Sequence, residues 1–336
     1  MPQTSQPSSG AGALTVGELA EAAVLARVVA RLPAVDAAHV GPGDDAAVVA
    51  SPDGRFVVTT DLMVHGPDFR LAWSRPADLG WKAAATNLSD VAAMGARPTA
   101  LVVALAAPAD TPVSVLEGIA DGLREACAAL APGCGVVGGD LSVSATLTIA
   151  VTAFGDLGGR APVLRSGARP GDLVAHAGRR GEAARGLALL FAEGVDDDGE
   201  PEPGRAEAVR AAHPALVAAQ LRPEPPVAAG VAAALAGATA MLDVSDGLAR
   251  DAARIADASG VGIDLDAAAL GATGGPVVFG AEDHGLLATF PADADLPDAF
   301  DVIGRVTAAA GTVSVDGGPI EPVGWDPYED WDGGAG

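Results

Sequence analysis

Apolar residues recur along the chain with two different periods, which predict a protein of both helices and strands. Helical spacing is found over residues 15–32, 76–94 and 112–131. Runs rich in apolar and β-branched residues predict strands over 55–61, 99–108 and 143–157. Thr15 and Glu18 have the spacing of a capping box, and Gly95 with Pro98 beyond it is a typical helix end.

The same alternation continues beyond a glycine-rich break at residues 155–162. Helices are expected over 182–193 and 246–260, and strands over 172–178, 239–244, 262–266, 285–290, 301–306 and 312–316. We therefore predict an α/β (α+β) protein of two domains, residues 15–158 and 159–336, preceded by a disordered tail over 1–14. The acidic, proline-containing segment 195–204 is interpreted as a solvated loop.

Charge narrows the range of ligands. The 336 residues include 44 Asp and Glu against 20 Lys and Arg, which gives a net charge of −24, and Lys82 is the only lysine. A surface for duplex nucleic acid requires a basic stripe that neutralises phosphates, and the sequence contains none. A phosphorylated ligand would have to be bound by metal ions, isolated arginines or backbone N–H groups.

Several other classes are excluded by what the sequence lacks. No uninterrupted apolar run approaches the roughly 18 residues of a membrane span, and the N-terminus lacks a basic signal-peptide region, so we expect a cytoplasmic protein. Cys127 and Cys134 are too few for a disulfide framework or a four-ligand zinc site. There is no P-loop, and the GCGVVG segment (133–138) follows a helix, which is the wrong context for a dinucleotide fold.

Acidic residues gather where predicted elements meet, most of them beside glycine-containing turns. Any one of these acids is adequately explained as a cap or turn former. As a set, however, carboxylates crowded without lysines repel one another unless a divalent cation binds them, and oxygen ligands favour Mg²⁺. We therefore predict a Mg²⁺-dependent phosphate site among Asp44, Asp45, Asp61, Asp90, Asp140, Asp243, Asp246 and the pair Glu282–Asp283.

A series of motifs resembles one family over residues 15–326. GDDAAVV, TTDLMVHGPDF, NLSDVAAMGA, GGD, RSGARPGD, LDVSDGLARD and GAEDHGLL occur in the order found in thiamine-monophosphate kinases, of the aminoimidazole ribonucleotide synthetase-like superfamily. The resemblance implies a homodimer in which the N-terminal domains form a β-barrel flanked by helices, followed by a C-terminal α/β domain. It also implies the reaction of ATP with thiamine monophosphate to give ADP and thiamine diphosphate, assisted by several Mg²⁺ ions.

The resemblance assigns roles to the matching positions of this chain. Those implied to bind ATP are Gly139, Asp140, Arg165 and Ser245. Those implied to contact thiamine monophosphate are Asp68, Glu282 and Trp325. The implied metal ligands, with Asp44 as a possible helper, are Asp45, Thr59, Thr60, Asp61, Asp90, Asp140, Asp243 and Asp246.

Some positions have a second interpretation. Arg165 could form an ion pair at the domain junction, and Trp325 could anchor the C-terminal tail instead of stacking on a cationic ligand. Glu282 could be an ordinary turn acid. Lys82 is expected to be an exposed stem or a salt-bridge partner, and no histidine is assigned a catalytic part.

The segment GAEDHGL (280–286) departs from the GGEDYEL of the family, as does the C-terminal tail. Both changes are expected on the thiamine side, which leaves two alternatives open. One is a related superfamily enzyme with another acceptor, although the cysteines of selenophosphate synthetases and hydrogenase-maturation relatives are missing from the required places. The other is a non-catalytic protein that binds thiamine phosphates and nucleotide, which would be marked by lost metal ligands.

Overall fold

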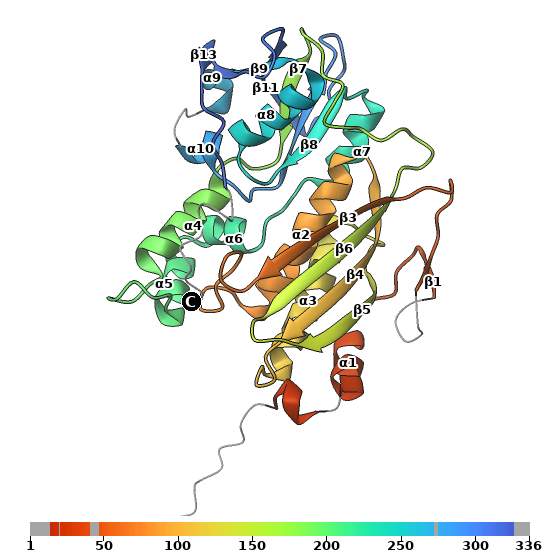
Figure 1. The fold of residues 1–336 in the computed structure, drawn as a ribbon, viewed down its shortest axis with the longest axis vertical. Coiled ribbons are helices and arrows are strands. Elements are labelled where there is room, and N and C mark those ends of the chain that lie inside the picture. The colour runs from red at the N-terminus through yellow and green to blue at the C-terminus, as the bar shows by residue number, and fades with distance from the viewer. Residues whose placement is uncertain (1–13, 20, 41–46, 272–274, 326–336) are drawn as a thin grey trace, which may run out of the picture.

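The structure is a computed structural model that describes residues 14–19, 21–40, 47–271 and 275–325. Its first half is built on a four-stranded sheet in the order β3-β6-β4-β5, in which only β4 and β5 are parallel (Figure 1). A short pair, β1 and β2, lies outside this sheet. The elements are η1 (Val16–Glu18), α1 (Glu21–Val29), β1 (Ala38–Val40), β2 (Val48–Val49), β3 (Val57–Val64), α2 (Pro76–Ala93), β4 (Arg97–Ala107), α3 (Val113–Leu130), β5 (Val136–Val143) and β6 (Thr148–Asp156).

The second half is built on a seven-stranded sheet in the order β13-β12-β9-β11-β7-β10-β8. Its strands pair antiparallel except β9 with β12. The elements are β7 (Leu173–Ala177), α4 (Glu182–Glu193), α5 (Pro203–Ala212), α6 (Pro214–Leu221), α7 (Val227–Leu235), β8 (Ala240–Val244), α8 (Leu248–Ser259), β9 (Gly262–Leu265), α9 (Ala267–Leu270), α10 (Gly275–Phe279), β10 (Gly285–Phe290), β11 (Phe300–Thr307), β12 (Val313–Val315) and β13 (Gly318–Pro319). The two-domain α/β architecture is as the sequence predicts.

Helix α2 packs against elements of both halves. It contacts β3 and β6 of the first sheet, β8 and β10 of the second, and the helices α3, α6 and α7. Fourteen of its 18 residues are buried, which explains why its sequence is apolar or small nearly all round. Gly80 and Gly230 permit this packing, because a Cβ there would lie 1.9 Å from the Ile119 carbonyl oxygen and 2.1 Å from that of Ala92. Side chains of α2 can therefore reach residues of either half.

The seven-stranded sheet is covered on both faces. Leu242 and Ile303 pack in one apolar cluster with Ile255 of α8. Met241 and Phe290 belong to the large cluster that also contains the core of the first half. The two halves thus share a continuous apolar core through α2 and α7.

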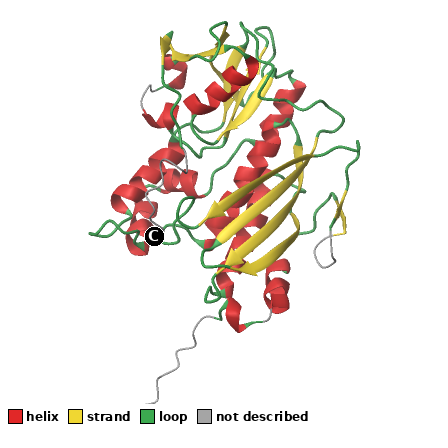
Figure 2. Cartoon of the chain, viewed as in Figure 1, coloured by secondary structure: helices red, strands yellow, loops and turns green. Residues whose placement is uncertain are grey.

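One face of the four-stranded sheet remains uncovered within the described chain. Helices α2 and α3 lie against the other face (Figure 2). On the uncovered side Val58 of β3 is 54% exposed and Leu62 58%. One chain does not close this sheet into a barrel.

The helix expected over residues 15–32 is wrong in one respect, because it is interrupted. The capping box of Thr15 and Glu18 is present, but it caps only the 3₁₀ turn η1, and Leu19 is extended. The N–H groups of Val16 and Gly17 donate instead to Thr111 O (2.8 Å) and Ala109 O (2.7 Å). These contacts attach η1 to a distant loop, and the extended conformation of Leu19 ends the turn.

Other helices and strands also begin or end at residues that differ from the prediction. The strand expected over 143–157 is the end of β5 followed by β6, and residues 55–61 begin a strand that continues to Val64, so Asp61 lies inside β3. Helices α5, α6 and α7 were not predicted, because their sequences are dominated by alanine, proline and valine with little helical periodicity.

Within the described residues, no helix is long and apolar enough to cross a membrane.

Candidate active site

Three carboxylates from three elements lie near enough to one another, beside the last turns of α2, for their charges to interact. They are Asp61 of β3, Asp90 of α2 and Asp243 of β8, here called the acid cluster. The Asp61 N–H donates to Asn87 Oδ1 at 3.2 Å, and Thr59 Oγ1 donates to Asp90 Oδ2 at 2.7 Å. These two bonds attach β3 to α2, so the NLSD motif contributes both a carboxylate and an amide that holds the strand.

The acid cluster carries excess negative charge. Burial, together with repulsion from Asp243 and Asp61, raises the pKa of Asp90 to about 7. Burial also raises the pKa of Asp61, and the charges of Asp243 and Asp246 act in the same direction. Ionised carboxylates in this arrangement are stabilised by a cation.

Asp243 is held by two neighbours. It accepts a hydrogen bond from Ser89 Oγ at 2.9 Å, and its Oδ2 lies 3.3 Å from His284 Nδ1. Burial acts to raise the pKa of Asp243, but the bond and charge of His284 outweigh it and hold that pKa low. The same pairing outweighs burial of the imidazole and raises the pKa of His284. His284 therefore contacts the acid cluster, which corrects the expectation that this departure from the family motif lies on the thiamine side.

The SDG turn after β8 places further predicted residues at the edge of the acid cluster. Asp246 pairs with Arg254 at 2.5 Å, and Arg254 also pairs with the buried Asp251 at 2.5 Å. The carbonyl oxygen of Ser245 accepts from the Glu282 N–H at 2.8 Å. Arg165 is exposed, and its charge helps to lower the pKa of Asp243. A metal ion bound by Asp246 would therefore replace the ion pair of Asp246 with Arg254.

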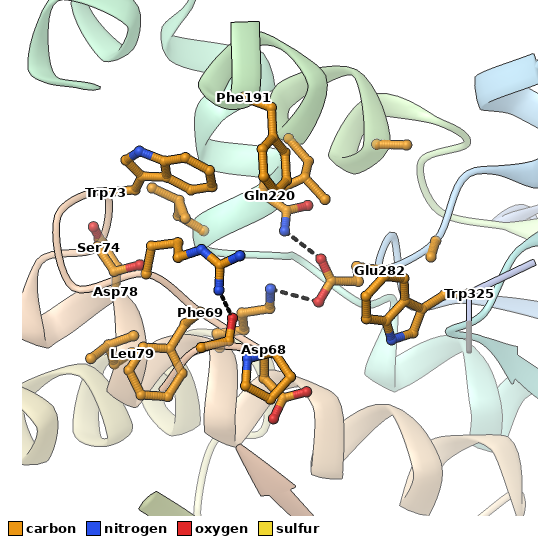
Figure 3. Close-up of a pocket in the computed structure, with 18 residues that line it drawn as sticks. Asp68, Phe69, Trp73, Ser74, Asp78, Leu79, Phe191, Gln220, Glu282 and Trp325 are labelled. Carbon is orange, nitrogen blue, oxygen red and sulfur yellow. Dashed lines mark hydrogen bonds and ion pairs between the residues drawn. The ribbon is translucent and has the colours of Figure 1, made fainter. Parts of the chain in front are cut away.

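A cavity of about 220 Å³ lies between the 66–74 loop, α4, α6 and the 281–282 turn, which leads to His284 beside Asp243 (Figure 3). All three residues implied to contact thiamine monophosphate line it: Asp68, Glu282 and Trp325. Trp73 and Phe191 form an aromatic wall, with ring centroids 4.8 Å apart in an edge-to-face arrangement. Mixed apolar walls with a few charged groups are typical of small-molecule sites.

Glu282 is fixed at the cavity by two side chains. Lys82 Nζ lies 2.7 Å from Glu282 Oε1, and Gln220 Nε2 donates to Oε2. Burial acts to raise the pKa of Glu282, but the charge and hydrogen bond of Lys82 outweigh it and lower that pKa. Glu282 has φ 70°, an uncommon conformation for a residue with a side chain. Lys82 is buried in this salt bridge, so the alternative of an exposed stem is wrong.

Asp68 and Trp325 also line the cavity. Asp68 Oδ2 accepts from the Val64 N–H at 2.7 Å, while burial raises the pKa of Asp68. The Trp325 N–H donates to Asp246 O at 3.0 Å, and Arg250 donates to the Trp325 carbonyl oxygen. The backbone of Trp325 therefore anchors the tail while its ring lines the cavity, so both interpretations of this residue have a structural basis.

The structure does not bring every predicted ligand together. Residues paired across β5, β4, β6 and β3 put Asp140 in one row with Leu62, on the face opposite Asp61 and roughly 14 Å away across three strand spacings. The Thr60 side chain also points to that face, where it donates to Val151 O at 2.9 Å. Close packing explains why residue 139 is a glycine, because a Cβ there would lie 2.0 Å from Val103 O. Asp44 and Asp45 lie outside the described residues.

The acid cluster is not a preformed metal centre. Among the described residues, no three His, Cys, Asp or Glu side chains converge closely enough to bind one ion. The residue types nevertheless fit Mg²⁺, which needs few protein carboxylates and keeps several waters. The raised pKa of Asp90 marks the uncompensated charge that such an ion would neutralise.

Several residues of the site were missed from the sequence. Asn87 and Ser89 lie in the NLSD motif, so their position beside Asp90 was a usable signal, whereas nothing in the sequence pointed to Gln220. Packing also explains the glycine at position 285, where this chain departs from the family motif. A Cβ there would lie 2.5 Å from Nε2 of the buried His176. The imidazole fills the space that a side chain at 285 would occupy.

Comparisons with known proteins agree on one family. The model of the AIR synthase related protein N-terminal domain matches residues 43–157, and that of the C-terminal domain matches 169–316. The chain is 43% identical to a thiamine-monophosphate kinase of Mycobacterium tuberculosis over 334 residues, covering 94% of this chain and 92% of the relative.

Solved structures give the same result. The thiamine-monophosphate kinase of Stenotrophomonas maltophilia superposes with a TM-score of 0.71 at 31% identity, covering 90% of this chain and 98% of that one. A ThiL protein in complex with AMPPCP and TMP superposes with a TM-score of 0.68 at 34% identity, covering 80% and 86%. With its two AIR synthase related domains and this similarity over nearly its whole length, the chain belongs to the thiamine-monophosphate kinase family.

Proposed function

We propose that this protein transfers the γ-phosphoryl group of ATP to the phosphate of thiamine monophosphate, giving ADP and thiamine diphosphate. The observation that carries this proposal is the 282–284 turn, which connects the cavity to the acid cluster. Glu282 lines the cavity and His284, two residues further on, contacts Asp243. A ligand with a ring system in the cavity would therefore direct its phosphate toward the carboxylates and the metal ions they hold.

Charge explains why the reaction needs this arrangement. Both substrates bring anionic phosphates, and two unit charges 4 Å apart repel by about 4 kcal/mol at an effective dielectric near 20. We propose that Asp61, Asp90 and Asp243 hold Mg²⁺, assisted by Thr59 and Asp246. When bound, the ions would neutralise the phosphates of both substrates and the charge that develops in transfer.

The proton requirements of the transfer are modest. The acceptor oxygen belongs to a phosphate monoester, which is largely deprotonated near pH 7. It forms a bond to the γ-phosphorus as the bond from that phosphorus to the β-phosphate oxygen breaks, so ADP leaves without needing a strong acid. The task of the protein is then to align the two phosphates.

For the thiamine side, we propose that Asp68 and Glu282 contact the ligand and that the Trp325 ring stacks on its cationic thiazolium, a cation–π arrangement. Of the other carboxylates that line the cavity, Glu282 is paired with Lys82 and Asp78 with Arg210, which favours Asp68 as the partner of the positive charge. The aromatic wall of Trp73 and Phe191 is suited to a flat heterocycle.

For the nucleotide side, the proposed contacts are Arg165, Ser245, Gly139 and Asp140, with Asp45 and Thr60 as further metal ligands. Asp140 and Thr60 are on the uncovered face of the four-stranded sheet, so we propose that they act where a second copy of the chain joins that face. Residues 15–158 would then be the nucleotide-binding and dimerisation domain, and 159–336 the C-terminal α/β domain, of a cytoplasmic enzyme.

A homodimer is the proposed assembly. The uncovered face exposes the apolar side chains of Val58 and Leu62. An exposed apolar sheet face is a common site of association, and closing two such sheets into a barrel would bury it.

The reaction can be tested with purified protein, ATP and thiamine monophosphate. Thiamine diphosphate should form with Mg²⁺ and cease to form when EDTA is added. Nucleotide binding without product would refute this acceptor and turn the search to another phosphorylated one. The absence of both binding and product would refute the kinase.

A further inference from the structure

Gln220 carries a polar atom that no described residue satisfies with a hydrogen bond. It lies near the end of α6, lines the cavity, and is 3% exposed. Its Nε2 donates to Glu282 (dashed in Figure 3), but its carbonyl oxygen Oε1 is buried and accepts no hydrogen bond from the described residues. A buried oxygen without a donor is unfavourable, and in a ligand cavity it identifies a position for a donor of the ligand.

The orientation of the carboxamide is fixed by its neighbours. Glu282 is paired with Lys82 at 2.7 Å, and an ionised carboxylate only accepts hydrogen bonds. Gln220 must therefore turn its NH₂ group toward Glu282 and its carbonyl oxygen away from it. Exchange of the two ends would place two acceptors against each other.

We propose that Gln220 is a specificity residue of the cavity, whose Oε1 accepts a hydrogen bond from the exocyclic amino group of the bound aminopyrimidine. This rests on the proposed function. The amino group is a neutral N–H donor on a flat ring, and the apolar surfaces of Phe191 and Leu187 line the same cavity as Gln220. Lys82 and Glu282 act as positioning residues, because together they hold the amide in the accepting orientation.

The test compares two substrates on four proteins. The substrates are thiamine monophosphate and an analogue with hydrogen in place of the amino group; the proteins are the wild type, Gln220→Leu, Gln220→Met and the control Ala218→Leu, at an exposed position of α6. Wild type and control should use the analogue with a kcat/KM about tenfold lower. Both Gln220 variants should lose about tenfold with the natural substrate and distinguish the two substrates by less than about twofold. The KM for ATP should be unchanged in all four, which verifies the fold, and Gln220→Met, of similar length, serves if the leucine variant does not fold.

The outcomes separate this assignment from the kinase itself. Variants that still discriminate about tenfold would show that Gln220 only orders Glu282, and would overturn the assignment. A wild type that phosphorylates both substrates equally well would also overturn it, while leaving the kinase intact. A wild type that phosphorylates neither would refute the proposed function as a whole.

Discussion

Asp90 lies at the junction of the two halves, on α2, where Thr59 of β3 donates to it and Asp243 of β8 repels it. Its environment does not stabilise its charge, since burial and two neighbouring carboxylates raise its pKa to about 7. A residue held in this state is a poor structural choice but a suitable cation ligand. At the scale of single residues, the raised pKa of Asp90 is the clearest sign of a cation-binding site.

Asp90→Asn should therefore separate activity from stability. We expect kcat to fall by about 100-fold or more, the loss typical when one electrostatic group is removed from a transition-state site. The melting temperature of the metal-free protein should not fall, because the substitution relieves repulsion. Steady-state kinetics and calorimetry measure the two effects, with exposed Asp257→Asn as control. Unchanged kcat in the Asp90 variant would remove this residue from the site.

His176 predicts a pH dependence. Burial, with a smaller contribution from Arg180, lowers the pKa of His176 to about 3, against about 6.5 in an unfolded chain. Below pH 6.5 the unfolded chain binds a proton that the folded protein does not, so the free energy of unfolding falls as the pH falls. Between pH 7 and 5 this amounts to about 2 kcal/mol.

The substitution His176→Leu removes that proton site. Urea unfolding at pH 7 and pH 5 should show the variant losing about 2 kcal/mol less than the wild type over this interval. The substitution of exposed His39 by Gln should leave the wild-type difference unchanged. Identical losses in the wild type and His176→Leu would mean that His176 is protonated in the folded protein.

At the scale of elements, two segments far apart in sequence complete each other. Helix α4 begins after Gly181, which has φ 71° and no side chain to cap the helix. Asp283, from the turn before β10, accepts from the N–H groups of Gly181 (2.5 Å) and Ala183 (2.9 Å) instead. The turn that carries Glu282 and His284 is thus attached to the helix that lines the cavity.

Asp283→Ala should destabilise this connection. Loss of a helix cap costs about 1–2 kcal/mol, and two unsatisfied N–H groups place the expected value toward the upper end. Chemical unfolding measures it, with Asp198→Ala in the exposed 195–204 loop as the control. Equal stabilities of the two variants would show that water satisfies the start of α4 as well as Asp283 does.

At the scale of the whole molecule, α2 joins the halves, and the uncovered sheet face is what remains for a second copy. We expect a mass in solution of twice the 32.9 kDa of one chain. Leu62→Glu would place a charge on that face and should give monomers, because burying an unpaired carboxylate is costly. Light scattering after gel filtration measures the mass, with Leu235→Glu, 72% exposed on α7, as control. A monomeric wild type would refute the assembly.

The fold class and most elements of the first half were predictable, because α2 and α3 are long segments with clear ends and β4 is a continuous apolar run. The unpredicted helices α5 to α7 have weak patterns, since their burial comes from packing on α2 and α4 and not from an amphipathic face of their own. Of the candidate site, the acidic residues were predictable as types. Their distribution over two faces of one sheet was not, because it depends on the register of β3 to β6.

The sequence by itself determined the chemistry available to this protein: many carboxylates at turns, a single lysine, and no basic surface. These follow from composition and local pattern, which need no knowledge of contacts. Only the tertiary structure decided which of them meet. It buried Lys82 against Glu282, turned His284 toward Asp243, and left the carbonyl oxygen of Gln220 without a donor among the described residues. The reason is physical, since burial and pairing are set by segments that are distant in sequence, and these determine the charge and hydrogen bonding of each group.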